Sequence, residues 1–163
     1  MKKKYQIGLI VGRFQPFHKG HLYLIKKTLF FVDKLIIGIG SANIENEDNP
    51  FSCKEREKIL KAVIKHEKIE ERIKNIVPLD DYMNDDLWRD KTLAVVGSFD
   101  VIVGNNEWVN RIFEKAGYPI LRLGFYRRSI YEGKKIRLMM KKHTNWFTRI
   151  PKYLSAFFAG LTR

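Results

Sequence analysis

The sequence predicts an α/β domain in which helices cover both faces of a five-stranded parallel sheet. Short apolar runs typical of strands buried on both faces recur along the chain, and a stretch with helical spacing follows each of them. The first strand–helix–strand unit, between residues 6 and 39, requires a crossover between parallel strands. We therefore expect a doubly wound, Rossmann-like sheet in strand order 3-2-1-4-5. The predicted strands are residues 6–11, 35–39, 73–78, 99–103 and 119–123.

Apolar spacing defines the first crossover. Leu22, Ile25 and Leu29 recur with helical periodicity after the first strand, which predicts a helix over residues 20–31. Residues 32–34 are then expected to turn the chain into the second strand.

A long loop and a capped helix follow the second strand. Residues 40–50 are the longest loop-like stretch, and they leave the sheet at the end where ligands bind in such folds. Ser52 is a suitable N-cap, with Glu55 three residues on, for a helix over residues 54–66.

The second half of the chain continues the alternation of strands and helices. Gly117 is placed to end one of these helices at its C-terminus. We expect one domain spanning residues 1–163, with a C-terminal helical segment at about residues 147–160. The helices predicted here are residues 85–96, 107–115, 132–142 and 151–159.

Bulk composition excludes several classes of protein. The 163 residues are 45% hydrophobic with a mean hydropathy of −0.31, as expected for a soluble globular domain. A single cysteine, Cys53, excludes an intrachain disulfide and a multi-cysteine zinc site, and it fits a reducing cytoplasm. No apolar stretch is long enough for a signal peptide or a membrane span. The net charge of +13 is compatible with nucleic acid, an anionic membrane surface or small polyanionic substrates. Because it is spread from Lys2 to Arg163, a solvated surface is the alternative.

Residues 12–21, Gly-Arg-Phe-Gln-Pro-Phe-His-Lys-Gly-His, connect the first strand to the first helix. His18 and His21 are three residues apart, so at a helix start they share one face. That face lies beside unpaired backbone N–H groups at the positive end of the helix dipole, which suit an anion. With Arg13 nearby, the stretch indicates a phosphate site. The alternative is that both histidines are ordinary surface residues.

This stretch resembles the first motif of archaeal-type nicotinamide mononucleotide (NMN) adenylyltransferases, in the nucleotidylyltransferase superfamily with its His-x-Gly-His signature. Residues 49–56, Asn-Pro-Phe-Ser-x-x-Glu-Arg, are similar to a second stretch of that family, and the resemblance covers about residues 5–155. It implies the same doubly wound fold, and formation of NAD and pyrophosphate from ATP and NMN.

The resemblance also implies site residues. His18, His21, Arg13 and Arg137 are expected to be catalytic. The expected NMN contacts are Ser41, Asp81 and Trp88. The expected ATP contacts are Gly12, Arg13, Phe14, His18, His21, Arg56, Gly104, Asn105, Arg127, Gly133, Lys134 and Arg137.

Some of these positions have simpler interpretations. On composition alone, Arg56 would be an exposed charge on a helix, and Gly104 with Asn105 would form a plain turn. For Trp88, an indole face suits the positively charged nicotinamide ring, but a core aromatic on the helix over residues 85–96 is the alternative.

The acidic stretch around Asp81 has no glycine and no terminal glutamate, so it does not fit a calcium loop. We expect no dedicated metal site in the protein, and Mg²⁺ is expected to arrive with ATP.

The phosphate stretch near residue 137 departs from the family pattern. Relatives typically have Tyr-Ser-Gly-Thr-x-Ile/Val-Arg, whereas residues 131–137 read Tyr-Glu-Gly-Lys-Lys-Ile-Arg. Gly133 and Arg137 match, and Lys134 is expected to hold phosphate as a point charge in place of a hydroxyl. Glu132 would repel a polyphosphate unless it points outward.

Two other functions stay open on the sequence alone. Transfer to pantetheine phosphate, FMN or glycerol phosphate is one, although relatives of those types usually have Gly-Thr-Phe-Asp where residues 12–15 read Gly-Arg-Phe-Gln. A basic, non-catalytic RNA-binding protein is the other, but it would need aromatics exposed on a sheet face. We expect nucleotides as partners, no nucleic acid, no membrane, a cytoplasmic location and a homo-oligomer.

Overall fold

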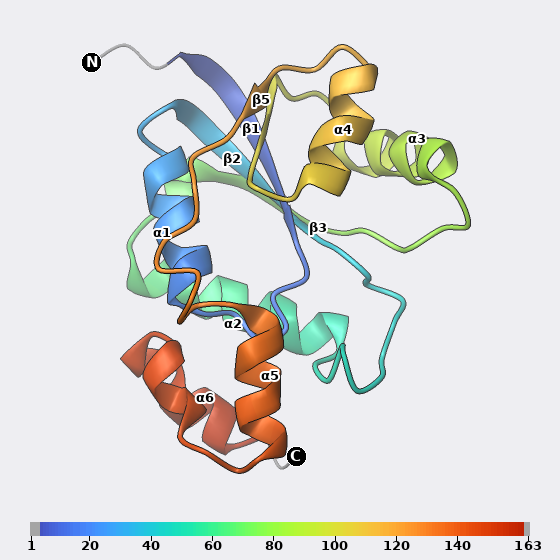
Figure 1. Cartoon of the computed structure of the whole chain (residues 1–163). Coiled ribbons are helices and arrows are strands. Elements are labelled where there is room, and N and C mark those ends of the chain that lie inside the picture. The colour runs from blue at the N-terminus through green and yellow to red at the C-terminus, as the bar shows by residue number, and fades with distance from the viewer. Residues whose placement is uncertain (1–3, 162–163) are drawn as a thin grey trace.

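In the computed structural model, which describes residues 4–161, the five parallel strands form one sheet in the order β3-β2-β1-β4-β5, as predicted (Figure 1). The strands are β1 (Tyr5–Gly12), β2 (Val32–Ile39), β3 (Ile73–Pro78), β4 (Val101–Val103) and β5 (Ile120–Leu121). The helices are α1 (Lys19–Thr28), α2 (Cys53–His66), α3 (Asp85–Val96), α4 (Glu107–Lys115), α5 (Gly133–Lys141) and α6 (Ser155–Ala159). Short 3₁₀ helices lie at Glu70–Arg72, Trp146–Arg149 and Lys152–Leu154.

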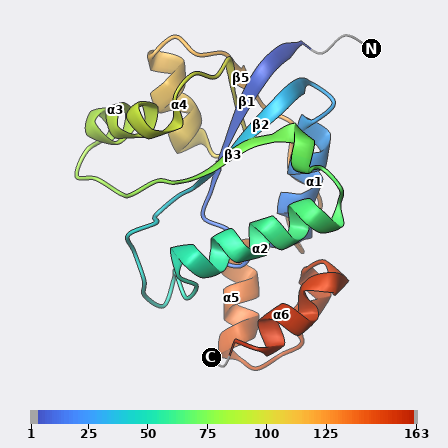
Figure 2. The same ribbon diagram turned by 180° about the vertical axis from the view of Figure 1, so that it is seen from behind.

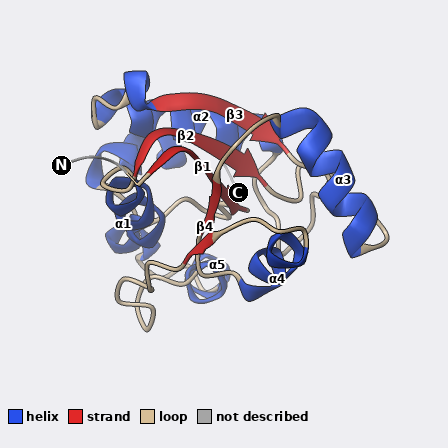
Figure 3. Ribbon diagram, turned by 90° about the horizontal axis from the view of Figure 1, so that it is seen from above, coloured by secondary structure: helices blue, strands red, loops and turns tan. Residues whose placement is uncertain are grey.

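Helices lie on both faces of the sheet (Figure 3). Alternate residues of the strands supply two apolar layers, one on each face. Ile10 and Ile37 pack with α1, α2 and the C-terminal segment, whereas Leu9 and Ile36 pack with α3 and α4. All four side chains are at most 2% exposed. Burial on both faces explains why the strands appear in the sequence as continuous apolar runs rather than as alternating ones.

The first crossover is shorter than predicted. α1 ends at Thr28, and the N–H groups of Phe30 and Phe31 bond back to the carbonyls of Lys27 and Thr28 in a turn over residues 29–31. β2 already begins at Val32, which is fully buried and pairs with β1. The predicted turn at 32–34 is therefore wrong, because burial of Val32 extends the strand.

Several other boundaries differ at the ends of elements, while β3, α3 and α4 match the predicted residues. β4 lacks Phe99 and Asp100, because the Asp100 carboxylate accepts the Ile7 N–H at 2.7 Å and the chain bends there. β5 is only two residues long. The predicted helix over 151–159 is divided into a 3₁₀ turn and α6. Ser52 caps α2 with Glu55 in a capping box, as predicted.

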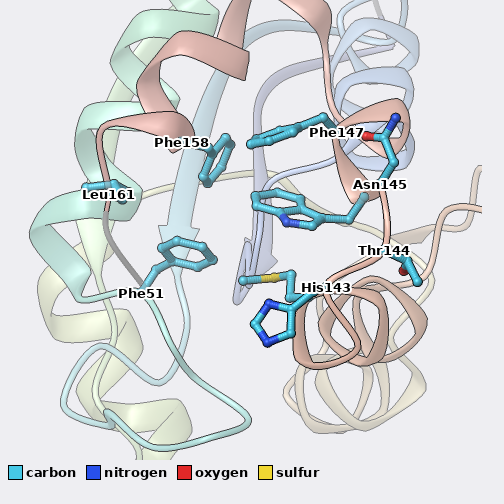
Figure 4. A pocket seen from close by; sticks show the side chains of 9 residues that line it. Phe51, His143, Thr144, Asn145, Phe147, Phe158 and Leu161 are labelled. Carbon is cyan, nitrogen blue, oxygen red and sulfur yellow. The ribbon is translucent and has the colours of Figure 1, made fainter.

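The C-terminal segment packs below α2, beyond the end of the sheet, as Figures 1 and 2 both show. Phe158 is 3% exposed and meets the rings of Phe51 and Trp146 edge-on, at centroid distances of 5.3 and 5.1 Å. These rings line a cavity of about 390 Å³ between α6 and the start of α2 (Figure 4). Among residues 4–161, no helix has the length and apolar character to cross a bilayer.

Candidate functional site

The β1–α1 loop holds His18 and His21 in one reciprocal arrangement. His18 is the N-cap of α1, and its Nδ1 accepts the Gly20 N–H at 3.0 Å. His21 Nδ1 accepts the His18 N–H at 3.2 Å, and the two rings stack with centroids 3.7 Å apart. A nitrogen that accepts carries no proton, so each neutral ring has its proton on Nε2. The two histidines therefore cap the helix with Nδ1 and keep Nε2–H as a donor.

Both histidines are uncharged at neutral pH. Burial, and then the positive charge of Arg128, lower the pKa of His18 to about 4. Burial, and then His18 itself, hold the pKa of His21 well below 6.5. Any stabilisation of an anion by these rings thus comes from neutral N–H donors, whose effect increases where the local dielectric is low.

Gly20 allows this arrangement. A Cβ atom at position 20 would lie 2.8 Å from Cε1 of His18, closer than two such carbons approach. The glycine of the His-x-Gly-His stretch is therefore required by the ring beside it, in addition to any role toward a ligand.

Arg137 on α5 reaches the same loop. Its Nη1 donates to the Gln15 carbonyl at 2.9 Å, and burial lowers the pKa of its guanidinium. The residue is 9% exposed and its Nε has no hydrogen-bond partner among the described residues, although Asp48 Oδ1 lies 3.9 Å away. A Cβ at Gly133 would lie 2.9 Å from Arg137 Nη1, so glycine there makes room for the guanidinium.

These groups line a cavity of about 700 Å³ where the strand order reverses, between β1 and β4. In doubly wound sheets this position is where ligands bind. The predicted site residues that line it are Gly12, Arg13, Phe14, His18, His21, Gly104, Asn105, Gly133, Lys134 and Arg137.

Further polar and aromatic residues, not predicted as contacts, also line this cavity. Arg128 lines the cavity, whereas Arg127 was the expected contact. The Arg128 guanidinium carbon lies 3.8 Å from the centroid of the Phe125 ring. The other residues of this kind include Asn106, Glu107, Asn110, Tyr126 and Tyr131. Of these residues, the sequence pointed only to Arg128, Tyr126 and Tyr131, which belong to the basic stretch predicted to bind phosphate.

The rim of the cavity on the β4–β5 side is fixed by side chains. Asn105 exchanges two hydrogen bonds of 2.9 Å with the backbone of Gly124. Glu107 binds Arg122 through both carboxylate oxygens, at 2.8 and 3.1 Å, and hydrogen bonds from Arg122 and then Asn110 lower the pKa of Glu107 to about 2. The carboxylate of Glu107 is therefore already paired.

Arg56 lies outside the cavity. It is fully buried, and its guanidinium donates to the carbonyls of Arg13, Gly40 and Ser41 at 2.7–3.0 Å. An exposed helix charge, the simpler interpretation, is thus wrong. The ATP contact implied for Arg56 stays a prediction, while the observed bonds join the ends of β1 and β2.

The three expected NMN residues follow β2 and β3. The Asn43 side chain joins these two loops, because it binds the backbone N–H and carbonyl of Asp81 at 2.8 and 3.3 Å. Ser41 is buried and Asp81 is exposed. Trp88 is only 2% exposed, among the apolar residues under α3 and α4, as the core alternative expects. Trp108, 42% exposed, packs against it at 4.8 Å.

No group of three or more His, Cys, Asp or Glu side chains among residues 4–161 is placed to hold a metal ion. A divalent cation in this cavity would therefore need ligands from the bound substrate as well.

The chain is similar to proteins of one family over most of its length. A family model described as cytidylyltransferase-like matches residues 9–148. The nicotinamide-nucleotide adenylyltransferase of Archaeoglobus fulgidus is 38% identical over 149 residues, which cover 89% of this chain and 86% of that protein. The Thermoplasma volcanium protein of the same name is 37% identical over 146 residues, covering 89% of this chain and 81% of its own.

A solved structure agrees over the same part of the chain. The bifunctional NMN adenylyltransferase/ADP ribose pyrophosphatase from Francisella tularensis has a TM-score of 0.74 and 27% identity. The match covers 90% of this chain and 45% of that longer one. A structure of the Francisella protein complexed with AMP and an Mn ion gives a TM-score of 0.71 at 26% identity.

His18→Asn should flatten the dependence of stability on pH. The unfolded chain binds a proton at position 18 below about pH 6.5, whereas the folded protein resists protonation of His18 down to about 4. The neutral ring therefore contributes its full share to the free energy of unfolding above about pH 6.5, the pKa of His18 in the unfolded chain. This contribution, up to about 3 kcal/mol, is lost as the pH falls toward the pKa of His18 in the folded protein. Asparagine keeps an N-cap acceptor but does not titrate.

The measurement is urea unfolding at about pH 7, 5.5 and 4.5. His66→Asn, at an exposed position, is the control. A pH slope in His18→Asn equal to that of the unmodified protein would contradict the burial argument.

Proposed function

The chain belongs to the cytidylyltransferase-like family and to its archaeal nicotinamide-nucleotide adenylyltransferases, and on this premise we propose that its cavity joins ATP and NMN into NAD and pyrophosphate. The observation that carries the proposal is the pair of neutral histidines beside Arg137, at the point of the sheet where the strand order reverses. The two N–H donors and the buried guanidinium therefore line the same cavity.

In the reaction, a phosphate oxygen of NMN attacks the α-phosphorus of ATP in line. The new phosphorus–oxygen bond forms as the bond to the β-phosphate oxygen breaks, and pyrophosphate leaves with that electron pair. A phosphate dianion needs no general base, so catalysis consists of positioning and charge stabilisation. We assign the Nε2–H groups of His18 and His21 to the charge that develops on the α-phosphoryl oxygens.

Cations supply the remaining contacts to the triphosphate. Arg13, Lys134 and Arg137 line the cavity and would hold phosphate oxygens. Gly104 and Asn105 are proposed to bind ATP through the rim, together with Arg127 from the loop before α5. Mg²⁺ would arrive with ATP and draw negative charge away from the phosphates.

We assign the acceptor NMN to the loops after β2 and β3, through Ser41, Asp81 and Trp88. The support is that Asn43 holds these loops together beside the cavity end of the sheet. ATP would then lie over β1 and β4, and the two substrates would meet near Gly12.

A homo-oligomer, a cytoplasmic location and a single domain over residues 1–163 are further proposals. The packing of Phe158 against Phe51 supports one domain. Light scattering on the purified protein measures the oligomeric state. An RNA-binding function lacks the exposed sheet face that it would need, because strand residues on both faces of the sheet are buried.

Pyrophosphate release from ATP, measured against NMN, nicotinic acid mononucleotide, FMN and phosphopantetheine, tests the function. We expect release with a nicotinamide-type nucleotide and none with FMN or phosphopantetheine. His21→Ala should lower kcat by on the order of 10²–10³ with little change in KM for NMN, because it removes one preorganised donor. Release with FMN alone, or normal turnover in folded His21→Ala, would overturn the assignment.

Trp88→Phe separates ligand contact from packing at that position. Phenylalanine keeps an aromatic ring in the core but is a weaker partner for a cationic ring, so NMN affinity should fall by roughly three- to tenfold. ATP affinity should stay unchanged in the same calorimetric titrations. Trp108→Phe, on the exposed side of the pair, is the matched control. Equal losses for both ligands in Trp88→Phe would mean that Trp88 only packs the core.

A further inference from the structure

The charges that line the 700 Å³ cavity are unevenly neutralised. Its cations are Arg13, Arg128, Lys134 and Arg137, and its carboxylates are Glu107 and Glu132. The Glu107 carboxylate is engaged at both oxygens by Arg122. The other cavity-lining carboxylate, Glu132, forms no ion pair with an arginine among the described residues.

Glu132 lies at the N-terminus of α5, where the helix dipole favours a negative charge. It is the N-cap of α5, yet its side chain makes no capping hydrogen bond. The nearest cation is Lys135, with Nζ 3.5 Å from Oε2, and that ammonium group also donates to the Ser129 carbonyl at 3.1 Å. The side chain of Glu132 is 28% exposed. Its charge is therefore only partly compensated and remains available to a ligand.

An anion is independently expected beside it. Arg137, on the same helix, is nine-tenths buried and lines the same cavity. Its Nε makes no hydrogen bond among the described residues, and the carboxylate nearest to it, Asp48 Oδ1, is 3.9 Å away. A triphosphate satisfying Arg137 would bring several negative charges close to Glu132, which is unfavourable in a site of reduced dielectric. A divalent cation removes the conflict. Mg²⁺ commonly binds to one or two carboxylates together with substrate phosphates, and it retains several waters.

We propose that Glu132 binds the divalent cation that accompanies ATP, directly or through a coordinated water, while Lys134 binds phosphate. The inference rests on the proposed function and deepens it. Glu132 and Lys134 thus place opposite charges at the start of α5 along the same cavity, so that this chain selects the metal complex of ATP over free ATP.

Calorimetric titration of ATP without acceptor nucleotide, in excess Mg²⁺ and in EDTA, tests this on the unmodified protein and on Glu132→Gln. In EDTA the variant should bind ATP more tightly, because a repulsive charge is gone. In Mg²⁺ it should bind more weakly, because a cation partner is gone. The factor by which Mg²⁺ strengthens ATP binding should fall by roughly five- to tenfold.

Two variants make the experiment selective. Glu47→Gln removes an exposed carboxylate that pairs with Lys141 on the same helix but does not line the cavity, and it should leave the Mg²⁺ factor unchanged. Glu132→Asp keeps the charge and should retain most of the factor. If Glu132→Gln increases ATP affinity equally with and without Mg²⁺, Glu132 acts only as a repulsive charge. If ATP affinity changes in neither condition, Glu132 is only a surface partner of Lys135. Both results overturn the inference.

The outcome is separable from that of the proposed function. If NAD forms normally while the Mg²⁺ factor is unaffected by Glu132→Gln, only the role of Glu132 is wrong. If the factor falls as expected but no nicotinamide-type nucleotide is adenylylated, the acceptor assignment is wrong and the role of Glu132 stands.

Discussion

The site depends on Gln15, a buried residue that joins three segments distant in sequence. Its side-chain Nε2 donates to the Phe51 carbonyl at 2.8 Å and its Oε1 accepts the Phe51 N–H at 2.9 Å, while its backbone carbonyl accepts a hydrogen bond from Arg137 Nη1. Both members of the pair are at most 2% exposed. Two aligned bonds in a dry environment fix the β1–α1 loop against the start of α2, and α5 is placed from that junction.

The remaining polar contacts extend this frame across the carboxyl end of the sheet. Arg56 joins the ends of β1 and β2 through carbonyls, and Asn43 continues the connection to the loop after β3. On the other side, Asn105 joins the ends of β4 and β5. Arg56, Asn43 and Asn105 all bind backbone atoms, so the loops hold their positions before any ligand binds. Such preorganisation is what stabilisation of a transition state by neutral donors requires.

Local patterns predicted the sheet order and most elements, because strands buried on both faces and capped helices leave strong signals in short windows. They failed where long-range packing decides: burial of Val32 lengthens β2, and Arg56 is drawn into the interior. The two histidines were predicted as a phosphate site, but their neutrality follows from burial, which a sequence does not display. The partner of Gln15 is 36 residues away, so its role had no local signal.

The central claim is tested most directly by Gln15→Met, which fills similar volume without either hydrogen bond to Phe51. The account predicts a folded protein whose free energy of unfolding falls by about 1–3 kcal/mol, together with a loss of at least roughly tenfold in kcat/KM for ATP, since a small displacement of catalytic groups is that costly. Gln6→Met, on the exposed side of β1, should change neither quantity. An unchanged kcat/KM in folded Gln15→Met would contradict the claim that this amide positions the site.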